Sequence, residues 1–199
     1  MESSRLFVAL PVPDAVQARL ATLQTDLRPR LPSRAASWTR AENLHLTLRF
    51  LGSVANESIA ALKLALHAVS AGTKPMRLAA QGVGCFPDLR RPAILWSGVK
   101  GDAGQLEKLQ RSVVEAAIPF AQTPAERNFT GHVALARFRR LRPRDVERLK
   151  TFLSEVARQR LGSWQADEFL LIRSELAPGG SRYTTLAKFA FRGGISDAT

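Results

Sequence analysis

The order of the expected elements repeats along the chain, and this repeat constrains the fold more than any other feature. Each half reads strand, helix, strand, helix, strand, over residues about 5–84 and about 92–192. In each half a histidine follows the opening strand at nearly the same distance, with 38 residues from Phe7 to His45 and 37 from Leu95 to His132. We therefore expect two lobes around a shared cleft, with one histidine contributed by each lobe.

The apolar spacing gives the elements of this repeat. It predicts strands at residues 5–10, 44–51, 76–83, 93–99, 129–138, 169–176 and 183–191, and helices at residues 16–27, 59–69, 102–117 and 143–156. We expect these strands to form mainly antiparallel sheets. The expected fold class is α+β, as a single two-lobed domain over residues 1–199.

The charge of the chain indicates an anionic partner. Lys and Arg number 29 against 17 Asp and Glu, which gives a net charge of +12. Nucleic acid, nucleotides, phosphate or a membrane surface would each fit this excess. A single cysteine, Cys85, excludes an internal disulfide and a cysteine-based metal cluster. The apolar run at residues 6–12 is too short for a signal peptide or a membrane span, so we expect a cytoplasmic protein, with a monomer as the default.

The first histidine strand carries polar side chains at alternate positions. On a strand, His45, Thr47 and Arg49 share one face, and Phe50 points with the leucines into the core. An imidazole, a hydroxyl and a guanidinium suit an anionic group rich in oxygen, because Arg binds phosphate through a planar fork of donors. This face is therefore a candidate phosphate site.

The second histidine strand leaves space above its imidazole. His132 shares its face with Thr130 and Ala134, and such small neighbours would admit a substrate. By strict alternation Arg137 falls on the opposite face, so it reaches the cleft only through a bulge or because the strand has ended. The third histidine, His67, lies at the solvent flank of its expected helix.

A pair of histidines can divide acid–base chemistry between them. Imidazole has an ordinary pKa of about 6.5, so one ring can accept a proton while the other donates one. The sequence has neither a His-Glu-x-x-His motif nor a cluster of acidic residues beside either histidine strand, which argues against a metal site. It also has no P-loop, dinucleotide fingerprint or G-x-S-x-G elbow. We therefore expect metal-free acid–base chemistry without a cofactor.

The chain resembles the 2H phosphoesterases, and closely their bacterial and archaeal RNA 2′,3′-cyclic phosphodiesterase branch, long called 2′-5′ RNA ligases. The resemblance spans nearly the whole chain. It rests on the segments 5–10, 45–52 with Trp38 before them, 86–87, 95–99, 132–137, 174–176 and 180–189. A His-x-Thr-x tetrapeptide alone is a weak signal, but the two histidine segments at this spacing are specific.

This resemblance implies the site roles. Members use the first histidine as proton donor and the second as acceptor, which assigns donor to His45 and acceptor to His132. They hydrolyse 2′,3′-cyclic phosphate ends to 2′-phosphates without metal, and some join RNA ends through a 2′-5′ bond without ATP. Thr47 and Arg137 correspond to phosphate contacts. The expected partners are RNA with 2′,3′-cyclic phosphate ends or small cyclic nucleotides.

The second motif departs from the family pattern. Its third position is Ala134 in place of threonine, and the residue before His132 is Gly131 in place of the usual proline. A phosphate-binding hydroxyl is therefore missing, and Thr130 is a hypothetical substitute. Two alternatives follow: an RNA-binding module with weakened or lost catalysis, or a 2H enzyme for another small phosphodiester.

Base and strand recognition are less constrained by the sequence. Phe86, Tyr183 and Trp38 are aromatic candidates for stacking on a nucleobase, although each also fits ordinary packing. The arginines Arg90, Arg91, Arg139 and Arg140 would suit an RNA backbone or a solvated surface equally well.

Overall fold

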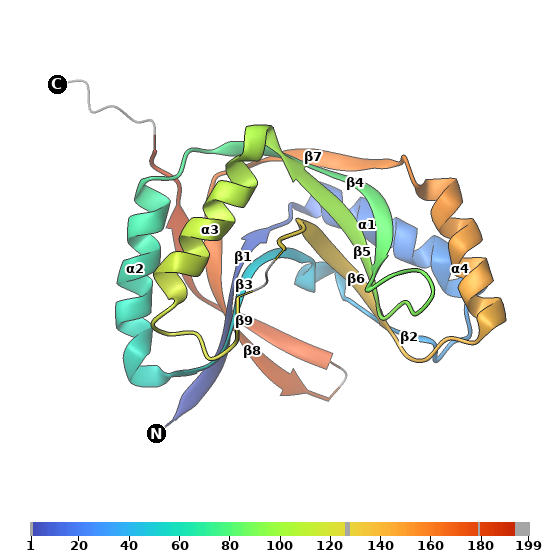
Figure 1. Cartoon of the computed structure of the whole chain (residues 1–199), viewed down its shortest axis with the longest axis horizontal. Coiled ribbons are helices and arrows are strands. Elements are labelled where there is room, and N and C mark those ends of the chain that lie inside the picture. Colours follow the sequence, from blue (N-terminus) through green and yellow to red (C-terminus); the bar gives the residue numbers. More distant parts are fainter. Residues whose placement is uncertain (1, 126–127, 179, 194–199) are drawn as a thin grey trace.

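The structure is a computed structural model that describes residues 2–125, 128–178 and 180–193. Met1 and residues 194–199 of the expected domain lie outside the described residues. Four α-helices pack around one curled antiparallel sheet, which confirms the α+β class (Figure 1).

The elements follow the repeated order expected from the sequence. The strands are β1 (Ser3–Pro11), β2 (Ala36–Trp38), β3 (His45–Ala55), β4 (Met76–Phe86), β5 (Ile94–Gly101), β6 (His132–Phe138), β7 (Arg160–Ala166), β8 (Glu168–Ala177) and β9 (Gly180–Ala190). The α-helices are α1 (Asp14–Leu27), α2 (Ile59–Ala71), α3 (Gln105–Ala117) and α4 (Pro143–Val156). All four predicted helices and seven predicted strands are present.

Two strands were not predicted. β2 has three residues, too few to show a period, and it pairs with β6. β7 contains Gly162 in a left-handed conformation and several polar side chains, so its sequence lacks the apolar run of a buried strand. It pairs along β4 and forms one edge of the sheet.

The strand order is symmetric about the centre of the sheet. It runs β7-β4-β5-β6-β3-β1-β8-β9, and these neighbouring strands pair antiparallel. β3 and β6 meet at the centre through one pair, Leu46 with Val133. On one side of that pair, β3 and β1 both come from the first half of the sequence. On the other side, β6 and β5 both come from the second half.

The third strand on each side comes from the other half of the sequence. β4 pairs with β5, and β8 pairs with β1. The two lobes therefore exchange a strand. The β3 lobe contains β3, β1, β8 and β9 with helices α2 and α3, and the β6 lobe contains β6, β5, β4, β7 and β2 with helices α1 and α4 (Figure 1).

One face of the sheet packs on the helices and forms the core. Leu10, Leu46, Leu95 and Val133 on the four central strands are fully buried, and they pack in a single cluster with the apolar sides of the helices. Alternate side chains on β3 and β6 therefore point to the opposite, concave face. Within the described residues, no helix is long and apolar enough to cross a membrane.

Candidate active site

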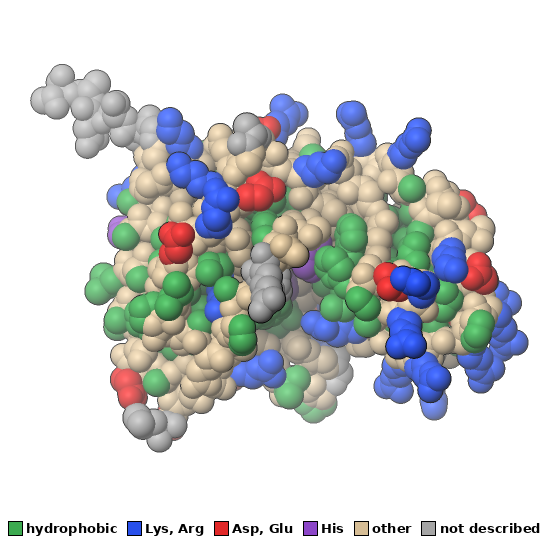
Figure 2. All heavy atoms as spheres, in the orientation of Figure 1, with side chains coloured by type: hydrophobic (Ala, Val, Ile, Leu, Met, Phe, Trp, Pro, Cys, Tyr) green, Lys and Arg blue, Asp and Glu red, His purple; other side chains and the backbone are tan. Residues whose placement is uncertain are grey.

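A cleft of about 460 Å³ lies on the concave face, where the two lobes meet. Histidine side chains are visible in the hollow at the centre of the molecule (Figure 2). The polar residues that line the cleft are Thr39, His45, Thr47, Asn128, Thr130, His132, Arg137 and Tyr183, and its apolar lining is Phe50, Phe86, Ile94 and Ala134. Among the described residues of this lining, none is acidic. The cleft therefore suits an anion.

The two imidazoles are held in the same way. Nδ1 of His45 lies 2.7 Å from the carbonyl oxygen of Asn43, and Nδ1 of His132 lies 2.7 Å from that of Thr130. A carbonyl oxygen only accepts hydrogen bonds, so each Nδ1 carries the proton. This leaves Nε2 of each ring as the nitrogen that can take up or release a proton.

Aromatic rings surround both histidines. The ring of His45 lies 4.8 Å from Phe7 and 5.4 Å from Tyr183, and His132 lies 5.0 Å from Phe86, measured between ring centroids. Burial lowers the pKa of His45 below its ordinary value, and the nearby charge of His132 lowers it further, against the opposing effect of the hydrogen bond that Nδ1 donates to the carbonyl oxygen of Asn43. The neutral form of His45 is therefore favoured in the free protein.

This lowered pKa predicts a pH dependence of stability. Below an ordinary pKa of about 6.5 the unfolded chain binds a proton at His45 that the folded protein resists. The stability associated with neutral His45 is thus fully present above about pH 6.5 and is lost as pH falls through the lowered pKa of the folded state. Urea unfolding at pH 7.5 and pH 5 should show this loss, and His45→Gln should reduce it. The exposed His67 supplies the control, and an equal effect of His67→Gln would contradict the assignment.

Both histidine strands carry a bulge at the same place. On β3, Thr47 pairs with Ala9 and Arg49 with Val8, so Leu48 is an extra residue. On β6, Ala134 pairs with Trp96 and Ala136 with Leu95, so Leu135 is extra. After a bulge the alternation of side chains is reversed. Positions five residues after each histidine consequently face the cleft.

The bulge on β6 brings Arg137 into the cleft. The sequence placed this residue on the far face unless the strand bulged or ended, and the bulge at Leu135 is the alternative that occurs. The carbonyl oxygen of Leu135 accepts hydrogen bonds from the side-chain amide of Gln24 at 2.7 Å and from the backbone N–H of Thr39 at 2.9 Å. These two donors hold the irregular backbone.

The same bulge on β3 corrects two predictions. Arg49 does not share the face of His45 and Thr47: it is buried, and its guanidinium donates to the carbonyl oxygens of Thr123 and Pro124. Phe50, which was predicted to lie in the core, is 48% exposed and lines the cleft. Strict alternation failed because the extra residue Leu48 separates Thr47 from Arg49. Arg49 thus fixes a loop, and it lies outside the cleft lining.

Replacement of Arg49 should therefore reduce stability. Arg49→Gln removes two charge-assisted hydrogen bonds from a buried position, and bonds of this type are each worth about 1.5–3 kcal/mol. We expect the free energy of unfolding to fall by about 2–3 kcal/mol in a urea titration. A phosphate contact would behave differently, since its loss would weaken phosphate binding without a change in the urea midpoint.

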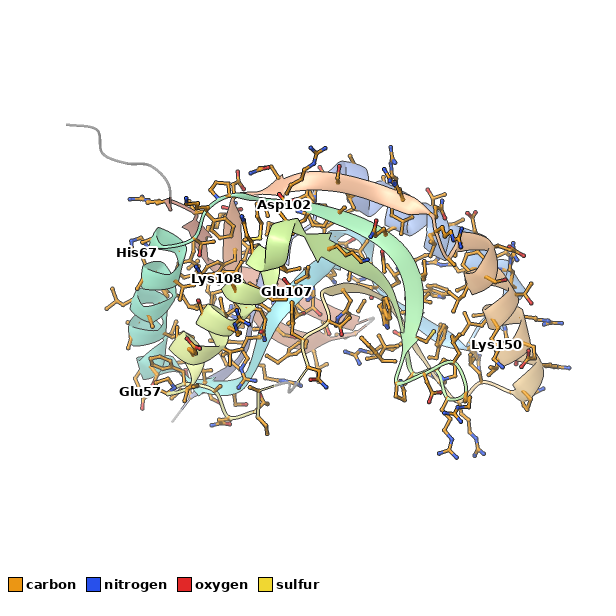
Figure 3. All side chains as sticks on the ribbon, turned by 45° about the horizontal axis from the view of Figure 1, so that its top comes forward. Glu57, His67, Asp102, Glu107, Lys108 and Lys150 are labelled. Carbon is orange, nitrogen blue, oxygen red and sulfur yellow. The ribbon has the colours of Figure 1, made fainter. Side chains whose placement is uncertain are left out.

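The remaining predicted contacts lie where the sequence placed them. Thr47, Thr130, Phe86 and Tyr183 all line the cleft. Antiparallel continuation of the Leu46–Val133 pair sets Thr47 opposite His132 and Ala134 opposite His45. The hydroxyl that the second motif lacks would therefore have been beside His45. His67 lies on helix α2, far from the cleft (Figure 3).

Besides Phe50, three lining residues were not predicted. Thr39 and Asn128 lie in loops, where no periodic pattern marks a side chain as facing a site, and Ile94 opens β5. Gly131 also has a packing role. A Cβ at this position would lie 2.7 Å from the carbonyl oxygen of Val99, so a side chain here would displace β5. Within the described residues, no group of three or more His, Cys, Asp or Glu is placed to hold a metal ion.

Comparison with known proteins identifies the family of the chain. The model of the LigT-like phosphoesterases matches residues 10–96 and 99–183, which include both histidines. The chain belongs to the LigT-like phosphoesterase family. The family assignment accounts for the two halves of the sequence and confirms the resemblance seen in the histidine segments.

Similar proteins cover nearly the whole chain. An RNA 2′,3′-cyclic phosphodiesterase of Archaeoglobus fulgidus is 31% identical over 93% of this chain and 99% of its own length. One of Thermus thermophilus is 31% identical over 95% and 91%. Among solved structures, a T. thermophilus protein has a TM-score of 0.76 at 30% identity, over 96% of this chain and 99% of its own. E. coli LigT complexed with 3′-AMP has a TM-score of 0.75 at 26% identity, with the same coverage.

Proposed function

We propose that this LigT-like phosphoesterase hydrolyses 2′,3′-cyclic phosphate ends of RNA to 2′-phosphates by metal-free acid–base catalysis, with His45 as proton donor and His132 as proton acceptor. The observation that carries the proposal is the matched pair of imidazoles, each held through Nδ1 so that Nε2 is available. The cleft has donors for phosphate. The relatives named RNA 2′,3′-cyclic phosphodiesterase support the substrate class.

The proposed reaction needs one proton transfer at each histidine. Nε2 of His132 takes a proton from a water molecule as its oxygen forms a bond to phosphorus. The bond from phosphorus to the 3′-oxygen breaks, and Nε2 of His45 protonates that oxygen. The products are a 2′-phosphate and a free 3′-hydroxyl. Thr47, Arg137 and Thr130 are the proposed donors to the phosphate oxygens, whose charge develops in the transition state.

The lowered pKa of His45 sets a requirement on substrate binding. A proton donor must be protonated when the substrate is present, whereas burial favours neutral His45 in the free protein. A bound phosphate anion opposes this effect, because a negative charge beside an imidazole raises its pKa. The proposal therefore includes proton uptake on binding of the cyclic phosphate.

The remaining parts of the proposal concern the substrate and setting. Phe86 and Tyr183 flank the two imidazoles and are the proposed contacts for a nucleobase or its ribose. Either an RNA end or a small cyclic nucleotide fits this arrangement. A monomeric, cytoplasmic enzyme is proposed, and reverse 2′-5′ ligation would use the same two histidines.

Ala134 supports a second candidate function. The side chain opposite His45 has no hydroxyl, so one phosphate donor of the family pattern is absent. An RNA-binding protein that keeps the cleft but turns over weakly is consistent with this loss. A 2H enzyme for another small phosphodiester is the remaining alternative.

The assay that separates these candidates uses 2′,3′-cyclic AMP in the presence of EDTA, with separation of the 2′- and 3′-phosphate products. A 2′-phosphate formed at the same rate with and without EDTA supports the proposed function. Binding without product supports the RNA-binding candidate. Turnover of another cyclic or linear phosphodiester at a much higher kcat/KM supports the third.

Ala134 also gives a prediction about the missing hydroxyl. Ala134→Thr should raise kcat for 2′,3′-cyclic AMP by roughly threefold to tenfold, because an ordinary added hydrogen bond is worth about 0.5–1.5 kcal/mol. If Thr130 already supplies this contact, Thr130→Val should lower kcat in the wild-type background and have less effect when combined with Ala134→Thr. A wild-type rate in Thr130→Val would show that Thr130 does not replace the hydroxyl.

A further inference from the structure

A second hollow, the basic groove, lies beside the active-site cleft and has a volume of about 770 Å³. It lies between the loop of residues 87–93, the loop of residues 139–142 and helix α4. Its cationic residues are Arg90, Arg91, Arg139, Arg140 and Lys150. Lys and Arg side chains gather at this α4 end of the molecule (Figure 2), and Lys150 lies on α4 (Figure 3).

The positive charge of the groove is poorly compensated. Glu147 is the one acidic residue in the described lining, and it already pairs with Lys150 at 2.7 Å. Asp88 lies beside the groove, where its carboxylate accepts the backbone N–H groups of Arg90 and Arg91 and lies 3.9 Å from the guanidinium of Arg90, an exposed pair that neutralises the groove only in part. Asp88 therefore fixes the loop that carries these two arginines. Arg139 and Arg140 are exposed on the opposite wall. The groove is suited to a polyanion.

The groove also has an apolar lining. Phe138, Leu141, Pro92 and Val146 line it together with the cationic residues. Folded proteins that bind single-stranded nucleic acid combine these two features, since cations follow the backbone and apolar or aromatic side chains contact the bases. A membrane surface or an acidic protein would also match the charge of the groove, but neither would use its concave apolar lining.

The basic groove adjoins the active-site cleft along residues 86–94: Phe86 and Ile94 line the cleft, and Arg90 to Ala93 between them line the groove. Arg137 lines the cleft, and the next residue, Phe138, lines the groove. The loop from Phe86 to Ala93 borders both, and it is closed by a hydrogen bond from the N–H of Ala93 to the carbonyl oxygen of Phe86 at 2.7 Å. A second bond of 2.8 Å joins the N–H of Phe138 to the carbonyl oxygen of Ala93. A strand that leaves the cleft across the segment 86–94 therefore reaches the groove on the other side of that segment.

We propose that the basic groove binds the single-stranded RNA that precedes the terminal cyclic phosphate. This inference rests on the proposed function. A 2′,3′-cyclic phosphate occupies the 3′ end of its strand, so the rest of the strand continues only on the 5′ side. With the terminal nucleotide in the cleft, the preceding nucleotides lie in the groove between Arg90 and Arg139. Oligonucleotides are thus better substrates than the cyclic mononucleotide.

The test compares one substrate that reaches the groove with one that does not. The substrates are an oligoribonucleotide ending in an adenosine 2′,3′-cyclic phosphate and 2′,3′-cyclic AMP. In Arg139→Gln/Arg140→Gln, kcat/KM for the oligonucleotide should fall roughly tenfold, and that for the mononucleotide should stay within about twofold, as expected for the loss of two exposed ion pairs. The dependence of log KM on log salt should become shallower by about 1.4, because each contact to a single strand contributes about 0.7.

The matched control removes two exposed arginines elsewhere. Arg19→Gln/Arg77→Gln changes the net charge equally but lies outside both hollows, so it should leave both substrates unchanged. Equal losses in the two double variants would attribute the effect to net charge and overturn the proposal. A loss on both substrates in Arg139→Gln/Arg140→Gln would also overturn it, as would wild-type protein that shows no preference for the oligonucleotide.

A binding measurement keeps this inference separate from the proposed catalysis. Fluorescence anisotropy with a labelled oligoribonucleotide and the His45→Gln/His132→Gln protein needs no turnover. Tight binding that the groove variant weakens supports the groove even if no cyclic phosphate is hydrolysed. Unchanged binding to RNA together with a loss of binding to phosphatidylserine vesicles would overturn the proposal in favour of a membrane surface.

Discussion

His132→Gln is expected to lower kcat for 2′,3′-cyclic AMP by roughly 10²–10⁴-fold, which is the typical contribution of one general acid or base. Gln keeps much of the size of the imidazole but does not titrate, so the cleft should stay filled while proton removal from water is lost. His45→Gln should have a comparable effect through loss of the proton donor. Product formation with 2′,3′-cyclic AMP measures both.

The pH profile distinguishes the two roles. If His132 is the acceptor, it must be neutral, so the rise in kcat/KM at low pH should disappear in His132→Gln. If His45 is the donor, it must be protonated, so the fall at high pH should disappear in His45→Gln. The opposite pattern would exchange the roles. His67→Gln changes an exposed histidine on α2, and it should retain the wild-type rate and both limbs.

Thr47→Val should have the next largest effect, with kcat reduced by roughly 10²–10³-fold, as found when one donor to a developing oxyanion is removed. Valine has nearly the same shape as threonine but has no hydroxyl. Thr47 lines the cleft opposite His132. Ala134, the equivalent residue of the second motif, has no hydroxyl and so cannot compensate for the loss of the Thr47 hydroxyl. Steady-state kinetics with 2′,3′-cyclic AMP would measure the change.

Two further variants test whether the hydroxyl is responsible. Thr47→Ser keeps the donor and should recover most of the rate. Thr22→Val removes an exposed hydroxyl that bonds only within helix α1, so it should leave kcat unchanged. A Thr47→Val protein with a normal kcat and an increased KM would show that the hydroxyl assists binding and not the transition state.

The sequence predicted the position of both histidines but not the local geometry around them. The matched spacing predicted one histidine from each lobe at a shared cleft, and His45 and His132 both line it. Thr47 and Thr130, which were predicted to share the faces of these histidines, line it as well. Alternation then failed after Leu48 and Leu135. A bulge is an irregularity of backbone pairing, and leucine is common in regular strands, so nothing in the local composition marks an extra residue at either position.

The periodicity of the sequence also could not predict which strands pair with one another. Apolar spacing predicts a strand at residues 76–83, but it does not identify the neighbour of that strand. β8 pairs with β1 from the other end of the chain, whereas β4 pairs with β5 across a short connection, and apolar spacing indicates neither partner. Thr39 and Asn128 illustrate the same limit, because loops from different parts of the chain bring them to the cleft.

The exchanged strands have a consequence for how the protein folds. β1 completes its pairing only when β8 arrives, more than 150 residues later in the chain. Because contacts of such large sequence separation are formed late and at an entropic cost, we expect slow, cooperative folding. Neither half of the sequence can complete its own sheet. The two imidazoles are therefore assembled in a single folding event, and a newly made chain has no partial activity before its last strands emerge.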